Sequence, residues 1–255
     1  MADHNERILD QFTRQAVPFS TAAPIRDAAA LQLLVDAAGT AADDTVLDVA
    51  CGPGLVACAF AHTARHVTGI DLTPAMLERG RALAAEQGLS NVTFQRGNVL
   101  PLPFADASFS IVVSRFAFHH FQDPAAVLAE MRRVCRPGGR VVVADLLASS
   151  DPAKAAAFHR MEMLRDPSHA RALTLDELRG LFAAAAFAPP DERFWQMQID
   201  VEDLLERSFP VAGSVPTIRQ MFADAVADDG MGLNTRREHG RVRFTYFNAV
   251  LTAAR

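Results

Sequence analysis

The sequence predicts an α/β fold with a doubly wound, mostly parallel sheet, and three observations support this. Residues 46–54, VLDVACGPG, form a buried strand pattern that breaks into a glycine loop, and the alanine-rich residues 55–64 after it have helix composition. Further short apolar runs alternate with helical patterns along the chain. One of these runs, at residues 140–146, is apolar on both faces, which is typical of a central strand covered by helices.

The composition is that of an ordinary globular protein. The chain has 255 residues, 50% of them hydrophobic, and a formal net charge of −5, so it is long enough for one sizeable α/β domain and lacks the basic surplus of a nucleic-acid binder. No apolar run approaches the roughly 20 residues of a membrane span, and the N-terminal MADHNERILDQF lacks a signal-peptide core. Cys51, Cys58 and Cys135 lack metal-ligand spacing. We therefore expect a cytoplasmic protein without a metal site.

The glycine loop is the predicted ligand site. A strand, a loop and a helix start bring backbone N–H groups and a positive dipole end to one point, and Gly52 and Gly54 leave that backbone bare. Gly52, Gly54 and Ala57 satisfy the dinucleotide fingerprint, with Asp71 at a plausible distance for a ribose. Asp48 argues against a dinucleotide, because a carboxylate at the strand end repels a pyrophosphate and suits a cationic nucleoside such as S-adenosylmethionine. Asp48 can also simply brace the loop by accepting its N–H groups.

Four motifs follow one another in order: VLDVACGPG, VTGIDLTPAML, GNVLPLPFADASFSIVVSRFAFHHFQDP and RPGGRVVVADL. With them the chain resembles the class I S-adenosylmethionine-dependent methyltransferases, and most closely the small-molecule group that includes the ubiquinone/menaquinone C-methyltransferases. The resemblance runs from about Asp43 to Leu147 and more loosely to the C-terminus. The sequence departs from the family pattern at Ala50, where glycine is frequent, and at Asn98, where aspartate is usual.

The resemblance implies a single methyltransferase domain over residues 1–255, with a seven-stranded sheet whose last strand is antiparallel. Residues 1–44 would form an N-terminal helical lid, residues 45–147 the cofactor-binding core, and residues 148–255 the acceptor-side helices and C-terminal strands. The implied cofactor is S-adenosyl-L-methionine, with S-adenosyl-L-homocysteine as its product. The implied acceptor is a small molecule, in particular a quinol- or phenol-like metabolite, methylated at carbon, oxygen or nitrogen by a monomer or homodimer.

The predicted elements are placed by apolar periodicity, caps and prolines. Residues up to about Asp44 are expected to be helical, apart from a loop at residues 17–24 between two prolines. Asp123 and Pro124 predict one helix start, and the Thr174 capping box predicts another. Strands are expected at residues 45–50, 66–70, 91–97, 109–114, 140–146, 192–199 and 244–253, and helices at 55–64, from 74, at 124–136, from 152, at 173–187 and twice within 200–241.

Asp71 is the expected ribose ligand. It ends the second predicted strand, and the two oxygens of a carboxylate can accept both ribose hydroxyls. Its alternative role is the N-cap of the next helix, although Thr73 already precedes Pro74 in the usual order of cap and proline. Leu72 and Met76 have a spacing that allows packing against an adenine face, and a place in the apolar core is the alternative for Met76.

Asn98 keeps an acceptor oxygen for the adenine amino group, and Val99 offers a backbone N–H and an apolar wall. A turn asparagine is the alternative for Asn98. The complete set of expected cofactor contacts is Asp48, Ala50, Cys51, Gly52, Gly54, Asp71, Leu72, Met76, Asn98, Val99, Ser114 and Arg115.

The methyl acceptor is expected beside the loop that follows the fourth strand. In an open parallel sheet, ligands bind outside the carboxyl ends of strands where the strand order reverses, and strands one and four flank that point. His119 or His120 in this loop could take a proton from a phenol, enol or ammonium group, because the ordinary pKa of histidine lies near 6.5. Either histidine could instead only hold the loop backbone. Phe116 belongs to the same loop.

Two further groups complete the expected acceptor and lid side. Phe12, Gln15 and Phe19 are candidates to line a lid, or to dock the N-terminal helices on the sheet. His159, Glu162 and Arg165 could order a polar acceptor or form a solvated helix face, and these six residues with Phe116 make up the acceptor and lid set.

The expected reaction is an in-line displacement that mainly requires alignment, which can supply about 7–11 kcal/mol of barrier reduction. Two rival functions remain from the sequence: an NAD-type oxidoreductase, through the dinucleotide fingerprint, and a non-catalytic scaffold that binds the cofactor.

Overall fold

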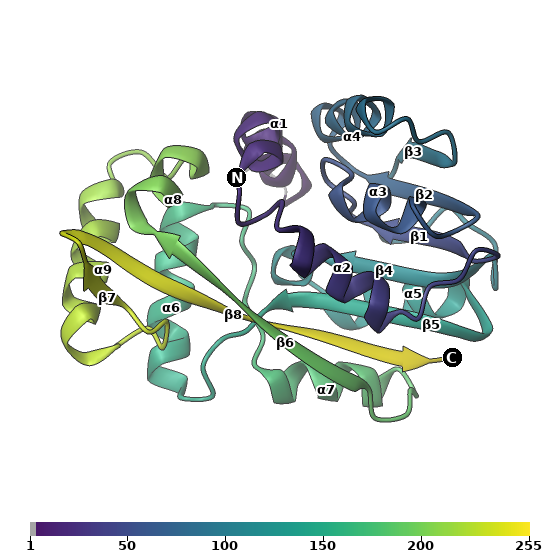
Figure 1. Cartoon of the computed structure of the whole chain (residues 1–255). Helices are drawn as coiled ribbons and strands as arrows, with labels where there is room; N and C mark the ends of the chain where they lie inside the picture. Colours follow the sequence, from purple (N-terminus) through teal and green to yellow (C-terminus); the bar gives the residue numbers. More distant parts are fainter. Residues whose placement is uncertain (1–3) are drawn as a thin grey trace.

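The computed structural model describes residues 4–255 and confirms the α/β class (Figure 1). Residues 1–3, part of the expected lid region and of the N-terminal stretch read above, lie outside the described residues. The sheet has the strand order β3-β2-β1-β4-β5-β8-β6, and a further strand, β7, pairs with β8. The strands are β1 (Thr45–Val49), β2 (His66–Asp71), β3 (Val92–Arg96), β4 (Phe109–Arg115), β5 (Cys135–Leu146), β6 (Asp191–Asp200), β7 (Arg236–Glu238) and β8 (Arg241–Ala254).

Helices cover both faces of the parallel half of the sheet, because its strands are apolar on both sides. Along β1, Leu47 and Val49 pack with α5 and α7, whereas Val46 packs on the other face with α2 and α3. The helices are α1 (His4–Thr21), α2 (Ala28–Ala37), α3 (Leu55–Ala61), α4 (Pro74–Glu86), α5 (Pro124–Val134), α6 (Pro152–Arg165), α7 (Leu175–Ala184), α8 (Val201–Ser208) and α9 (Val215–Asp228), with a short 3₁₀ turn η1 (Phe118–His120).

The strand β8 joins the two halves of the molecule. Its second half, Asn248–Ala254, pairs antiparallel with β5, which confirms the antiparallel last strand. Its first half continues beyond β5 and pairs only with β6 and β7. In Figure 1 this extension reaches α6, α8 and α9, and residues such as Phe244 and Tyr246 pack there with Phe158 and Phe222. The extension therefore builds a second apolar core beside the parallel sheet.

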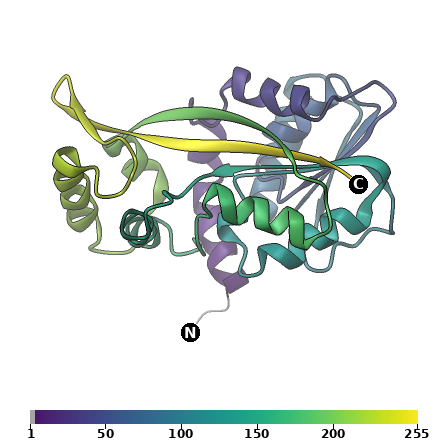
Figure 2. The same cartoon turned by 90° about the horizontal axis from the view of Figure 1, so that it is seen from below.

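The helix α1 lies between these two halves in both views (Figures 1 and 2). It runs through Pro18 to Thr21, so the predicted loop at residues 17–24 is wrong over its first half. Pro18 has no N–H to donate to the carbonyl of Arg14, so α1 loses one backbone hydrogen bond there and ends one turn later. Oγ of Ser20 donates a hydrogen bond to the carbonyl of Val17 over 2.9 Å in that last turn.

Two further differences concern the strands. The three-residue β7 adds an eighth strand to the seven that were expected, and it is too short to show a periodic pattern. β5 begins at Cys135 rather than at Arg140, since Cys135 pairs with Phe109 before a bulge, and the helix α5 accordingly ends at Val134. Within residues 4–255, no helix is long and apolar enough to cross a membrane.

Candidate active site

A cavity of about 340 Å³ opens where the parallel strands end, and α1 covers it. We call it the first cavity. Its size falls in the range of small-molecule sites, about 300–1,000 Å³. Ten of the twelve expected cofactor contacts line it: Asp48, Ala50, Cys51, Gly52, Asp71, Leu72, Met76, Asn98, Val99 and Arg115. From α1 come His4, Asn5, Ile8, Phe12 and Phe19.

The backbone of the glycine loop is left-handed at three positions. Ala50 has φ +55°, Gly52 φ +50° and Gly54 φ +76°. A left-handed residue favours glycine, which explains why glycine is frequent at position 50 and implies a cost of about 1–2 kcal/mol for Ala50. At Gly54 a Cβ atom would lie 2.7 Å from Cζ of Phe94, whereas at Gly52 nothing lies within 4 Å. Gly54 thus serves close packing, and Gly52 leaves the cavity open.

Asp71 holds the loop in place. Its Oδ2 accepts the N–H of Gly52 and its Oδ1 accepts the N–H of Thr73, each over 2.8 Å. Burial raises the pKa of Asp71, and these N–H donors oppose the rise. Thr73 is the N-cap of α4 but makes no side-chain cap bond, and the carboxylate of Asp71 accepts the N–H of this residue rather than one within the helix. Each of its oxygens accepts one backbone bond and retains acceptor capacity toward the cavity.

Asp48 and Arg115 face the same cavity with buried polar atoms that have no partner. Oδ2 of Asp48 makes no hydrogen bond, and neither do Nε and Nη2 of Arg115. Burial raises the pKa of Asp48 to about 8, although a hydrogen bond from the backbone N–H of Ala57 opposes this rise. Burial lowers the pKa of Arg115 to about 10. Nη1 of Arg115 donates to the carbonyl of Ile25 over 3.0 Å, which fixes the guanidinium. An unpartnered buried acid and an unpartnered buried guanidinium at one cavity indicate a ligand that carries both a cationic and an anionic group.

Gly54 and Ser114, also expected to contact the cofactor, do not line the first cavity. Gly54 caps α3 with its backbone. Oγ of Ser114 donates to the carbonyl of Val49 over 2.9 Å and ties β4 to β1. Oδ1 of Asn98 accepts the N–H of Leu100 over 3.3 Å, so the asparagine forms the turn foreseen as its alternative while it still lines the cavity.

A second cavity of about 70 Å³ lies beside the first. The two share Phe12, Phe19, Ile25, Phe116 and His120, which therefore separate them. The remaining lining residues are Gln15, His119, Leu146, Arg165, Asp166, Met197, Arg207, Ser208 and Tyr246. Of the expected acceptor and lid residues, His159 and Glu162 line neither cavity.

Phe116 is the aromatic wall between the cavities. Its ring centroid lies 4.4 Å from the guanidinium carbon of Arg115 and 5.9 Å from the ring centroid of Trp195. It has φ +55°, a left-handed conformation that aims the loop after β4 between both cavities.

His119 is held by Asp145, the acid near the end of β5. Nδ1 of His119 lies 2.6 Å from Oδ1 of Asp145, and the His119 N–H donates to Oδ2 over 3.1 Å. Burial lowers the pKa of His119, but the Asp145 carboxylate outweighs this effect, so the pKa stands above its ordinary value. The proton then resides on Nδ1, and Nε2 is left as an acceptor, which is the arrangement of an oriented general base.

His120 has the opposite electrostatics. Its Nδ1 lies 3.0 Å from the carbonyl of Ser168, and Nε2 of His4 lies 2.7 Å from the His120 carbonyl. Burial and the neighbouring His119 lower the pKa of His120, so its imidazole is neutral at neutral pH. His120 thus holds the loop, as its alternative role foresaw, and also lines both cavities.

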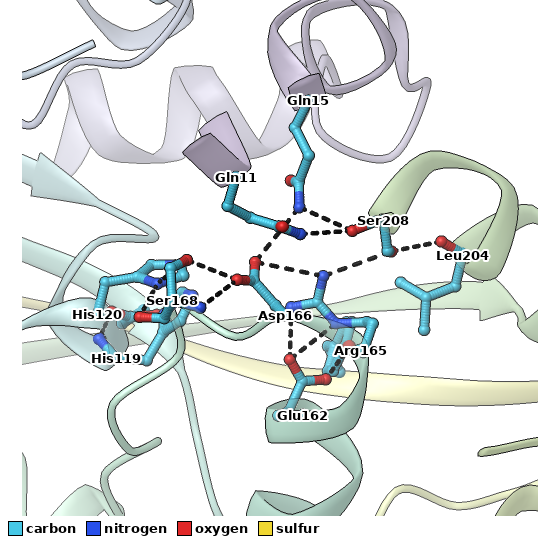
Figure 3. Close-up of polar contacts among 12 residues, drawn as sticks. Gln11, Gln15, His119, His120, Glu162, Arg165, Asp166, Ser168, Leu204 and Ser208 are labelled. Atoms are coloured by element: carbon cyan, nitrogen blue, oxygen red, sulfur yellow. Dashed lines mark hydrogen bonds and ion pairs between the residues drawn. The ribbon is translucent and has the colours of Figure 1, made fainter. Parts of the chain in front are cut away.

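A polar network closes the second cavity (Figure 3). Arg165 donates through Nε and Nη2 to Oε2 of Glu162, over 2.9 and 2.5 Å. The hydroxyl of Tyr246 donates to Oε1 of the same glutamate over 2.6 Å. Glu162 is therefore a fully buried support that orients Arg165, rather than part of a solvated face.

Gln11 and Gln15 fasten α1 to this network (Figure 3). Nε2 of Gln11 donates to the carbonyl of Ser208 over 2.6 Å, and Nε2 of Gln15 donates to the same carbonyl over 3.1 Å. The same amide lies 3.4 Å from Oδ2 of Asp166. The helix that covers the first cavity is thus attached to the wall of the second.

Comparison with known proteins agrees with this geometry. Residues 47–143 match the family model described as a methyltransferase domain. Over 190 residues the chain is 35% identical to the uncharacterized methyltransferase YcgJ of Bacillus subtilis, covering 74% of this chain and 73% of YcgJ. The chain belongs to the class I S-adenosylmethionine-dependent methyltransferases. The crystal structure of YcgJ matches this methyltransferase with a TM-score of 0.82 at 29% identity, over 89% of this chain and 98% of that one.

Other relatives of this methyltransferase carry different acceptors in their names. The demethylmenaquinone methyltransferase of Renibacterium salmoninarum is 37% identical over 114 residues, which cover 45% of this chain and 46% of that one. The arsenite methyltransferase of Halobacterium salinarum is 32% identical over 168 residues, which cover 61% of this chain and 41% of that one. The acceptor of this methyltransferase must therefore be inferred from its own residues.

Sequence reasoning missed several residues of this methyltransferase. Asp145 was taken as part of an apolar strand, although an acid near the carboxyl end of a buried central strand is itself a signal for the ligand side of the sheet. Tyr246 and Arg207 carried no local signal, because they reach the second cavity only through the packing of β8 and α8.

Proposed function

We propose that the first cavity binds S-adenosylmethionine and that a phenol- or quinol-like small molecule accepts the methyl group beside the second cavity. The observation that carries this proposal is the pair of unpartnered buried groups, Oδ2 of Asp48 and the Nε and Nη2 of Arg115. The amino-acid end of this cofactor has an ammonium and a carboxylate, which supply the partners that these two groups lack.

The rest of the first cavity fits the nucleoside. The free acceptor capacity of Asp71 suits the two ribose hydroxyls. Met76, Leu72 and Val99 offer apolar surface for the adenine ring, and Asn98 stands where its amide can meet the ring edge. Gly52, with nothing within 4 Å of its missing side chain, lets the ligand approach the backbone.

His119 is the base in this proposal. The cofactor supplies a methyl group that is activated by a positively charged sulfur. His119 receives the proton of the acceptor hydroxyl on Nε2, and Asp145 stabilises the imidazolium that results. Phe12 and Phe116 keep the acceptor aligned and exclude water, which serves a displacement whose leaving group needs no acid.

A cofactor titration tests the proposal. S-adenosylmethionine at a hundredfold excess over its dissociation constant should stabilise the protein by about 2.7 kcal/mol, whereas NAD should leave the unfolding midpoint unchanged. Arg115→Gln should weaken this binding by about tenfold, and Arg237→Gln, at an exposed residue of β7, should not. Stabilisation by NAD alone would refute the proposal. Incubation with phenols and quinols, followed by mass spectrometry for one added CH₂ group, distinguishes an enzyme from a scaffold.

A further inference from the structure

We propose that the second cavity binds an anionic group of the acceptor, a carboxylate or a phosphate, and that Arg207 and Arg165 hold it. This inference rests on the proposed function and specifies the class of acceptor.

The size of the second cavity suits one small polar group. Its volume of about 70 Å³ is several times the roughly 10–15 Å³ that a cavity needs to hold one water molecule, so a carboxylate or phosphate has room there. The cavity adjoins the first across Phe116 and His120. An acceptor whose reactive hydroxyl lies where the two cavities meet, on the side lined by His119, can therefore place its other end further into the second cavity.

Arg207 lines this cavity without a direct partner among the described residues. Its guanidinium is half-buried and makes no hydrogen bond or ion pair within residues 4–255. Asp203, the acid of its own helix whose charge acts on Arg207, is itself paired with Nη2 of Arg241 over 2.7 Å. A guanidinium has five N–H donors and cannot lose its proton, so a half-buried one without partners favours an anion.

The two carboxylates nearest this site, Glu162 behind the cavity wall and Asp166 on it, are engaged by groups other than Arg207. Both oxygens of Glu162 are engaged by Arg165 and Tyr246. Oδ1 of Asp166 accepts the N–H of Ser168 over 2.9 Å and its hydroxyl over 2.5 Å. Oδ2 of Asp166 lies 3.7 Å from Nη1 of Arg165, so both acids are engaged by groups other than Arg207, which is left as the arginine of this cavity without an acidic partner.

Arg165 provides the second donor. Its Nε and Nη2 are occupied by Glu162, but Nη1 has only distant neighbours, Oγ of Ser208 at 3.4 Å and Oδ2 of Asp166 at 3.7 Å. The two hydrogen bonds to the single oxygen Oε2 of Glu162 fix the guanidinium, so Arg165 loses little side-chain freedom when Nη1 binds an anion. The guanidinium of Arg165, fixed by Glu162, and the unpartnered guanidinium of Arg207 can together donate hydrogen bonds to the oxygens of a carboxylate or a phosphate.

Binding of three simple probes to the full chain tests the inference. Benzoate, phenyl phosphate and the neutral benzamide are titrated by calorimetry, with and without saturating S-adenosylhomocysteine. We expect at least one anion to bind about tenfold more tightly than benzamide, as charge-assisted hydrogen bonds would give. Arg207→Gln should remove this preference, and the matched Arg237→Gln, an exposed arginine of β7, should retain it. The tighter of the two anions identifies carboxylate or phosphate as the group.

Equal binding of all three probes, absence of anion binding, or an undiminished anion preference in Arg207→Gln would overturn the inference. The affinity for S-adenosylhomocysteine is measured separately in each protein. If that ligand does not bind while the anion preference holds, the proposed cofactor is wrong and the anion site stands. If it binds while the preference is absent, only the anion site is wrong.

Discussion

Replacing Asp48 with asparagine should make the cofactor-free protein more stable and the cofactor complex weaker. The carboxylate is 1% exposed, its Oδ2 has no partner, and burial raises its pKa to about 8. In the unfolded chain the same group titrates near 4. Between these two values the unfolded chain has released the proton while the folded chain retains it, so Asp48 lowers stability as the pH rises.

The magnitude follows from the size of this shift. One pKa unit corresponds to about 1.4 kcal/mol, so the cost of Asp48 grows by up to that amount per pH unit and reaches about 4 kcal/mol at pH 7. The asparagine NH₂ group lacks a partner at the same place, which costs about 1–3 kcal/mol. The net gain for Asp48→Asn at pH 7 is therefore about 2 kcal/mol, and it should shrink toward pH 5.

Urea unfolding of the cofactor-free protein at several pH values between about 5 and 8 measures this difference. Asp44→Asn is the matched control, because Asp44 is equally buried but paired with Arg140 at 3.1 Å, and its loss should destabilise the protein throughout. Two results would show that the Asp48 carboxylate is ionised and paired. In one, the difference in free energy of unfolding between wild type and Asp48→Asn does not change with pH; in the other, the variant is less stable than wild type at pH 7. Calorimetry should show at least about tenfold weaker binding of S-adenosylmethionine to the variant.

Three further results are expected. Asp71→Ala should weaken cofactor binding by about 1.5 kcal/mol or more, measured by calorimetry, and unchanged affinity in a folded variant would remove Asp71 from the site. Gly54→Ala should lower the free energy of unfolding by about 2 kcal/mol through the clash described above, whereas Gly52→Ala should cost about 1 kcal/mol but weaken cofactor binding at least tenfold; equal effects on stability would contradict this distinction. Asp145→Asn should lower kcat at least tenfold with the cofactor affinity unchanged, and because the carboxylate raises the pKa of His119, the acidic limb of the kcat profile should move to lower pH. An unmoved limb would argue that His119 is not the base.

The residues that line the first cavity were largely predictable because their signals are local. Asp48 and Asp71 lie at the ends of apolar strands, and Gly52 follows within the same short loop, so strand periodicity and loop chemistry together indicate where they meet. The fold class and the antiparallel last strand were confirmed by the pairing of β8 with β5.

The acceptor side was predictable only in part, because it depends on contacts between distant segments. Tyr246 and Glu162 are 84 residues apart in sequence, and His119 and Asp145 are 26 apart. No local pattern specifies such pairs. Arg207 lies on a helix whose place is determined by the extension of β8 beyond the parallel sheet.

The wall between the cavities has a practical consequence. Trp195 is the sole tryptophan of the sequence, and its indole centroid lies 5.9 Å from that of Phe116, one of the rings that line both cavities. A ligand that binds in either cavity contacts Phe116 and therefore changes the environment of Trp195. The tryptophan emission of the unlabelled protein should therefore change when each of two ligands binds. The order in which they bind can then be followed in real time.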